Sequence, residues 1–130
     1  MHRSRILNIV LDCDDMPAAE AFWTAALGRQ VMYRDEHYVE LGPPIGNLWF
    51  ILQRVPESKT VKNRVHIDFT TDNLDAEVAR LEALGARRKQ FIEKWWIMED
   101  PCGNEFCVLA NWREEYSTDA ETWETDQGPA

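Results

Sequence analysis

The chain has 130 residues, a formal net charge of −9 and 45% hydrophobic residues, which suits one domain with enough apolar material for its own core. Because nucleic acids and anionic lipid surfaces attract clustered positive charge, this acidic balance argues against both as partners. The apolar run from Ile6 to Leu11 is too short, and too closely followed by aspartates, for a signal sequence or a membrane span, so we expect a cytoplasmic protein.

The first predicted elements are a strand at residues 6–13 and a helix that follows it. Asp14 and Asp15 are suited to cap this helix, Pro17 suits its first turn, and Gly28 ends it. Turn signals then separate three short predicted strands, at residues 30–34, 38–41 and 48–53.

The second half of the chain follows the same order. A predicted strand at residues 64–71 alternates between polar and apolar side chains. The next helix has an apolar stripe from Leu74 to Leu81 and ends at Gly85. Three more strands are expected at residues 87–92, 95–99 and 105–109.

Matching segments indicate that the chain is duplicated. Residues 8–12 match residues 66–70, and Ala26-Leu27-Gly28 matches Ala83-Leu84-Gly85 at nearly the same separation. The pair Gly46-Asn47 returns as Gly103-Asn104. Ordered repeats of this kind indicate internal duplication. We therefore predict an α+β fold of two tandem βαβββ modules, at about residues 5–55 and 63–110, within a single domain at residues 1–110.

The predicted repeat ends at residue 110, and an acidic tail follows it. Residues 111–130 contain six acidic residues and one arginine, and they have no counterpart in the first module. Trp112, Tyr116 and Trp123 could dock on the body of the protein or on a second subunit. Because self-repulsion opposes compaction, we expect residues beyond Tyr116 to add little stability.

Several motifs carry a resemblance to a known family. They are Phe22-Trp23 within the first helix, Leu27-Gly28 at its end, His66 on the fifth strand, and the segment from Asp100 to Asn104 before the last strand. The chain resembles the glyoxalase/bleomycin resistance/dioxygenase superfamily, also called vicinal oxygen chelate, and especially its small bacterial glyoxalase-like proteins. The resemblance implies sheets paired into a curved cup that holds the ligand, helices on the outer face, and a homodimer.

Enzymes of this superfamily hold a divalent metal through four ligands, from the first and last strands of each module. The matching positions are Asn8, His66, Cys107 and, depending on the strand register, Phe50 or Gln53. This set has no carboxylate and mixes hard with soft donors. We therefore expect no metal site, no cofactor and no ordinary metal-dependent glyoxalase I activity, although a divalent metal stays conceivable.

His66 and Asp68 are the candidate catalytic residues. Arg64, His66 and Asp68 are spaced two residues apart, so their side chains should share one face of the predicted strand. The histidine is either a hydrogen-bonded structural residue or a general acid or base that Asp68 orients. Cys107 is expected to be a small buried thiol, because the three cysteines lack a C-x-x-C pair and only His66 could activate it.

Aromatic and basic residues complete the predicted ligand site. Neighbours in a strand face opposite ways, so one of the adjacent Trp95 and Trp96 should line the cup together with Trp49. Arg64 is suited to hold a carboxylate in a fork. The predicted ligand-binding residues are Asn8, Trp49, Phe50, Gln53, Arg64, Trp95, Trp96 and Cys107.

Two functions of different classes follow from these residues. The first is a metal-free protein that binds a small acidic or oxygen-rich ligand in its cup. The alternative is a lyase, isomerase or dioxygenase of the superfamily's type that uses His66. A dimeric accessory domain is a third reading, and the fold alone does not decide between them.

Overall fold

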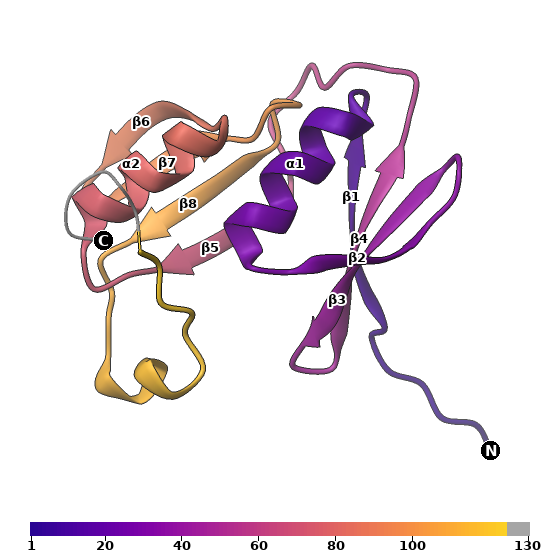
Figure 1. Cartoon of the computed structure of the whole chain (residues 1–130), viewed down its shortest axis with the longest axis horizontal. Coiled ribbons are helices and arrows are strands. Elements are labelled where there is room, and N and C mark those ends of the chain that lie inside the picture. The colour runs from indigo at the N-terminus through magenta and orange to yellow at the C-terminus, as the bar shows by residue number, and fades with distance from the viewer. Residues whose placement is uncertain (125–130) are drawn as a thin grey trace. The chain divides into compact units, whose positions relative to one another are not determined.

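The structure, a computed structural model, describes residues 1–124 and divides into two compact units, Met1–Lys59 and Thr60–Ala130. Each unit contains a strand, a helix and three further strands in that order (Figure 1). Each set of four strands forms its own mixed sheet. The predicted α+β class with two βαβββ modules is confirmed. A common cup and a single domain over residues 1–110 stay predictions.

The first unit forms a sheet with the strand order β1-β4-β3-β2. Strands β1 and β4 are parallel, and the other two pairs are antiparallel. Its elements are β1 (Asn8–Cys13), α1 (Met16–Leu27), β2 (Gln30–Arg34), β3 (Tyr38–Ile45) and β4 (Leu48–Arg54).

Helix α1 begins and ends where its capping residues predict. The Asp15 side chain accepts a hydrogen bond from the backbone N–H of Ala18 at 3.2 Å, and Gly28 ends the helix with a positive φ of 64°. Trp23 on the buried side of α1 lies 5.2 Å from the ring of Phe50 in β4. This contact shows which face of the first sheet the helix covers.

The second unit repeats the topology, with the strand order β5-β8-β7-β6. Asn73 caps its helix by accepting a hydrogen bond from the backbone N–H of Ala76 at 3.1 Å. Its elements are β5 (Ile67–Thr70), α2 (Leu74–Leu84), β6 (Arg87–Ile92), β7 (Trp95–Glu99) and β8 (Glu105–Leu109).

Strand β5 is shorter than the predicted strand at residues 64–71, and this is a correction. Arg64 and His66 precede the strand. The Asn63 side chain explains the difference: its Oδ1 accepts the backbone N–H of Glu105 at 3.1 Å, so a side chain takes the place of a further ladder bond. Strand β3 is longer than predicted, because pairing resumes at Ile45 beyond the Gly42-Pro43 peptide.

Each sheet has one face toward its helix and one opposite, which we call the helix-free face. In the first sheet Phe50 and Leu52 face α1, so the alternate residues of β4 face the other way. In the second sheet Arg88 bonds to Glu82 of α2 at 3.0 Å. Arg88 is in register with Met98 and Phe106, which therefore share the helix side.

The segment after β8 docks on the second unit. It contains a short 3₁₀ helix, η1 (Glu114–Thr118), and the Trp112 and Tyr116 rings lie 6.0 Å apart. Further on, the Trp123 ring lies 3.8 Å from the guanidinium carbon of Arg80 in α2. Trp123 thus contacts the body of the second unit, as one sequence-based alternative proposed. Residues 125–130 of the predicted tail lie outside the described range.

Within residues 1–124, the helices are all too short or too polar to cross a membrane.

Candidate functional site

Three ionisable side chains meet on the helix-free face of the second sheet. His66 lies directly before β5, Asp68 lies within it, and Cys107 on β8 is the register partner of Asp68. Nε2 of His66 is 3.3 Å from Oδ1 of Asp68. One donor atom from each of the three residues lies within 4.8 Å of the others. The structure therefore brings together the two predicted catalytic residues and the predicted thiol.

Cys107 is held as a neutral thiol. Its residue is 6% exposed, and burial raises the pKa of the thiol, with the negative charge of Asp68 and a hydrogen bond to that carboxylate adding to the effect. The positive charge of Lys62 opposes the shift in this pKa. A thiol with a raised pKa is a poor nucleophile. Cys107 therefore lies beside Asp68 as a buried, protonated thiol.

A buried carboxylate lies next to this group on the same strand. The Glu105 side chain is 2% exposed, and its Oε2 accepts hydrogen bonds from Nζ of Lys62 at 3.4 Å and from Nζ of Lys89 at 3.2 Å. Since side chains alternate along β8, Glu105 and Cys107 share the helix-free face. Glu105 was not among the predicted site residues, and it holds one lysine from the segment before β5 and one from β6.

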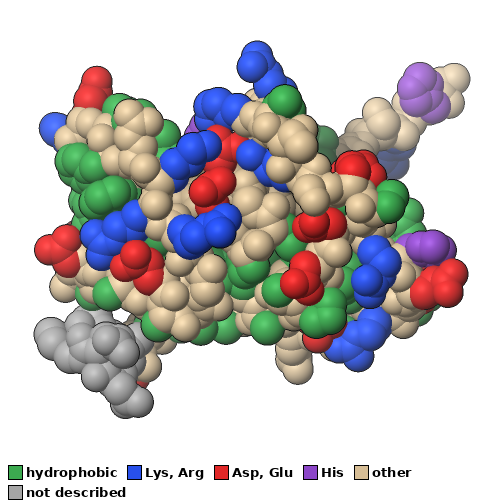
Figure 2. All heavy atoms as spheres, turned by 90° about the horizontal axis from the view of Figure 1, so that it is seen from above, with side chains coloured by type: hydrophobic (Ala, Val, Ile, Leu, Met, Phe, Trp, Pro, Cys, Tyr) green, Lys and Arg blue, Asp and Glu red, His purple; other side chains and the backbone are tan. Residues whose placement is uncertain are grey.

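Figure 2 shows one face of the molecule, on which Lys and Arg side chains lie among Asp and Glu side chains. The printed ion pairs of the second unit follow the same pattern, with Arg88 on Glu82 and Arg87 4.0 Å from Glu99. Arg87 and Arg88 are therefore each matched by a carboxylate.

The turn before β8 is built by the motif that carried the family resemblance. Asp100 is fully buried, and its Oδ1 accepts the backbone N–H groups of Cys102 at 2.9 Å and Asn104 at 2.8 Å. Asn104 in turn accepts a hydrogen bond from Nδ2 of Asn63 at 3.2 Å. This turn fixes the start of β8, and thus the position of Glu105.

The two adjacent tryptophans of β7 face opposite ways. Trp96 lies on the helix side, with its ring 5.2 Å from Phe91 and 4.9 Å from the Arg88 guanidinium carbon. Trp95, in register with Leu109, lies on the helix-free face with Cys107. Of the two alternatives left open by the sequence, Trp95 therefore shares the face of the site.

The predicted ligand-binding residues of the first unit also lie on opposite faces of their sheet. Phe50 is buried beneath α1, whereas Gln53 and Trp49 lie on the helix-free face of the first sheet. Asn8, the register partner of Trp49, shares that face. The Trp49 ring covers Gly42 so closely that an added Cβ there would lie 2.7 Å from it.

The strand pairing corrects the register that the Gly-Asn repeat suggested. In the first sheet Ile9 pairs with Phe50, and in the second sheet the equivalent Ile67 pairs with Phe106. The first-unit equivalent of Cys107 is therefore Ile51, neither Phe50 nor Gln53. The turn between the last two strands differs between the units, and this shifts the register by one residue.

The donor set does not fit the four-ligand metal centre that the resemblance implies. At the equivalent first-unit positions, Ile51 has no donor atom and Asn8 offers a neutral amide. Within residues 1–124, the group that could hold an ion is His66, Asp68 and Cys107, all from the second unit. A hard divalent ion favours oxygen donors, and this group offers one carboxylate beside a protonated thiol.

Comparison with known proteins identifies the fold independently. A family described as glyoxalase-like domain matches residues 8–109. Among solved structures, the fosfomycin resistance protein FosX from Listeria monocytogenes is similar, with 18% identity and a TM-score of 0.68, covering 88% of this chain and 95% of that chain. A comparison with curated proteins finds no match.

Two further solved structures share the fold. Lactoylglutathione lyase from Agrobacterium tumefaciens has 23% identity and a TM-score of 0.59, covering 82% of this chain and 93% of that chain. A glyoxalase/bleomycin resistance protein/dioxygenase family enzyme from Burkholderia phytofirmans has 19% identity and a TM-score of 0.63, covering 78% and 94%. With the family match over both βαβββ modules, the chain belongs to the glyoxalase-like domain family.

Proposed function

We propose that the chain binds a small acidic or oxygen-rich ligand at the helix-free face of the second sheet, without a catalytic metal. The observation that carries this proposal is the exposed His66–Asp68 pair, 3.3 Å apart, on the face that also holds Trp95. The imidazole supplies a hydrogen-bond donor. The indole supplies an apolar surface for a planar part of the ligand.

A related fold supports the ligand class. The FosX structure from Listeria monocytogenes is described as a complex with Mn(II) and dihydroxypropylphosphonic acid, a small acid. In the present chain the positions equivalent to a four-ligand centre include Ile51, so we propose that acid binding uses protein groups alone. We also propose a homodimer and a cytoplasmic location.

A titration tests this proposal directly. Benzoate, phenylphosphonate and neutral benzamide are added to the protein in EDTA while tryptophan fluorescence is followed. We expect saturable binding of the two acids, weaker binding of the amide, and no change when Mn²⁺ replaces EDTA. Binding of the acids only with Mn²⁺ would contradict the metal-free mode, and binding of none of the probes would contradict the ligand class.

A second candidate function is proton transfer, and the His66–Asp68 pair favours it. A carboxylate beside an imidazole orients the ring and stabilises its protonated form, which is what a general base requires. We propose this as the alternative, in the manner of a lyase or isomerase. The test is NMR detection of hydrogen exchange at the carbon next to a carbonyl of small keto acids in D₂O. Exchange that His66→Ala leaves unchanged would contradict it.

A further inference from the structure

Two lysines that are distant in the sequence share one buried oxygen atom. Lys62 comes from the segment before β5 and Lys89 from β6, and both donate to Oε2 of Glu105 at 3.4 and 3.2 Å. Lys89 lies at the irregularity between Arg88 and Gln90, where β6 loses its register with β7. Such an irregularity re-aims a side chain. Here it brings Lys89 to the carboxylate.

Lys62, Lys89 and Glu105 together have a formal charge of +1, and Asp68 and Glu99 lie on the same helix-free face. One buried carboxylate cannot neutralise two ammonium groups, and each ammonium has three N–H donors. The Lys62 and Lys89 side chains are 63% and 44% exposed, whereas the Glu105 side chain is 2% exposed. The fixed negative charge is thus held beneath the two positive charges. Because both ammonium groups bond the same oxygen, one small anion can reach both.

This group lies beside His66 along the β5–β8 pair. Phe106, which follows Glu105, is the register partner of Ile67, which follows His66. Asn63 ties the two segments together, because its backbone N–H donates to Oε1 of Glu105 at 2.9 Å while its side chain accepts from the Glu105 backbone N–H. Through four hydrogen bonds, Glu105 therefore holds Lys62, Lys89 and Asn63 at the start of β8, the strand that pairs with β5 after His66.

Arg64, the predicted anchor for an acidic group, is held differently. It lies outside β5 and is exposed. Among residues 1–124 the Arg64 side chain has no hydrogen-bond or ion-pair partner, so it loses conformational freedom when it binds a ligand, and that loss reduces affinity. Lys62 and Lys89 are already held by Glu105, so their side chains lose less conformational freedom when a ligand binds.

We propose that Lys62 and Lys89 together form the anchor for the acidic group of the ligand, a carboxylate or phosphonate, with Glu105 as the positioning residue beneath them. This inference rests on the proposed function and names the groups that select the acid.

The test compares three variants that each remove one positive charge: Lys62→Ala, Lys89→Ala and Arg64→Ala. Phenylphosphonate and benzamide are titrated into each full-length protein in EDTA, and binding is followed by amide NMR shifts, which also report that each variant is folded. We expect each lysine variant to weaken phenylphosphonate binding about tenfold or more, the scale of a lost charge-assisted hydrogen bond. Arg64→Ala should change it less than about twofold, and benzamide binding should stay the same throughout.

The outcomes separate this inference from the function on which it rests. If the unaltered protein binds no acid, the proposed function fails. If it binds the acid and all three variants lose affinity equally, the effect is general electrostatics and the lysine anchor is wrong. If only Arg64→Ala loses affinity for the acid, the lysine anchor is wrong and Arg64 is the anchor. Lys62→Arg and Lys89→Arg, which keep the charge, should retain most of the affinity.

Discussion

The two sheets have the same topology and register, yet their helix-free faces differ in chemistry. Where the first sheet has Asn8, Val10, Trp49 and Ile51, the second has His66, Asp68, Glu105 and Cys107 at the equivalent positions. Their helix sides, in contrast, are alike: Phe50 and Leu52 of the first sheet correspond to Phe106 and Val108, and all four are buried.

This contrast separates the requirements of folding from those of function. The helix side must be apolar in both copies, because burial beneath a helix supplies the stability of each module. The helix-free face is under no such constraint, so ionisable groups gather there in one copy. Along β1 and β4 the helix-free face of the first sheet has one ionisable residue, Asp12, whereas the second sheet brings His66, Asp68, Glu105 and Cys107 together.

The largest expected effect is a loss of stability, and it tests whether the helix sides of the two sheets are packed alike. Phe50→Ala and Phe106→Ala each remove a buried ring, so each should lower the free energy of unfolding by about 3–5 kcal/mol. Urea denaturation followed by circular dichroism measures both. A loss at one position below about 1 kcal/mol would show that the two equivalent positions are packed differently.

A smaller effect concerns the segment that only the second unit carries. Arg80 is buried, forms a 2.7 Å ion pair with Glu77, and lies beneath the Trp123 ring. Trp123→Ala should lower the free energy of unfolding by about 1–2 kcal/mol, because a shielded cation–π contact is lost. Thermal denaturation is the measurement. An unchanged melting temperature would restore the sequence-based expectation that residues beyond Tyr116 add little.

The third prediction concerns the Cys107 thiol, which the first sheet replaces with Ile51. Its raised pKa means that the folded state favours the protonated thiol. The protonated thiol therefore stabilises the folded protein below its pKa in the unfolded chain, and this stabilisation is lost as pH rises through its higher pKa in the folded protein. Cys107 should therefore react with iodoacetamide more slowly than Cys102, as measured by mass spectrometry.

A matched variant of the Cys107 experiment isolates the cause. Asp68→Asn removes the neighbouring charge and should speed the reaction of Cys107, while leaving that of Cys102 unchanged. If Cys107 reacts at the same rate in both proteins, burial alone controls the thiol.

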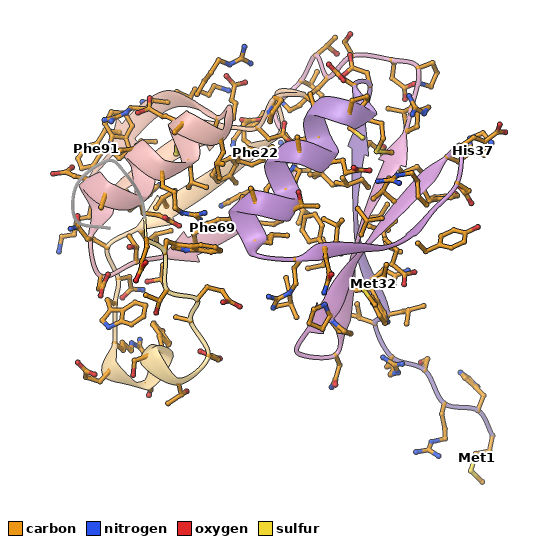
Figure 3. All side chains as sticks on the ribbon, viewed as in Figure 1. Met1, Phe22, Met32, His37, Phe69 and Phe91 are labelled. Atoms are coloured by element: carbon orange, nitrogen blue, oxygen red, sulfur yellow. The ribbon has the colours of Figure 1, made fainter. Side chains whose placement is uncertain are left out.

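The smallest effect lies in the first unit, at the hairpin that carries His37 at its tip (Figure 3). Asp35 accepts the backbone N–H groups of His37 and Tyr38, both at 2.8 Å, and these bonds lower its pKa. The Asp35 carboxylate therefore stabilises the folded state above its pKa in the unfolded chain. This stabilisation is lost as pH falls through its lower pKa in the folded protein.

Asp35→Asn tests the pH dependence at this hairpin. The difference in melting temperature between the variant and the unaltered protein should be largest above the ordinary aspartate pKa of 3.8 and should narrow toward lower pH. A difference that stays constant with pH would contradict the assigned role of the carboxylate charge.

The order of elements and both helices could be predicted because their signals are local. Asp15, Asn73 and the two helix-ending glycines act within one turn of the chain, and apolar periodicity marks each buried face. The pairing of His66 with Asp68 followed from two-residue alternation near β5. These parts of the fold and site need no information about distant contacts.

The rest depends on contacts that sequence patterns do not encode. The equivalence of Ile51 with Cys107 depends on the turn before each last strand, which a dipeptide repeat cannot resolve. Lys89 reaches Glu105 because of an irregularity in β6, and Arg64 leaves the strand because Asn63 takes its hydrogen-bonding place. The predicted anchor therefore fell on Arg64, and Lys62 and Lys89 were not predicted.

The central claim is that the second sheet, and not its copy, carries the ligand site. The most direct measurement is the affinity for phenylphosphonate, in EDTA, of His66→Ala and of Asn8→Ala, the same truncation at equivalent positions of the two sheets. We predict a loss of about tenfold or more for His66→Ala, the scale of one charge-assisted hydrogen bond, and less than about twofold for Asn8→Ala. Equal losses, or a larger loss for Asn8→Ala, would contradict the claim.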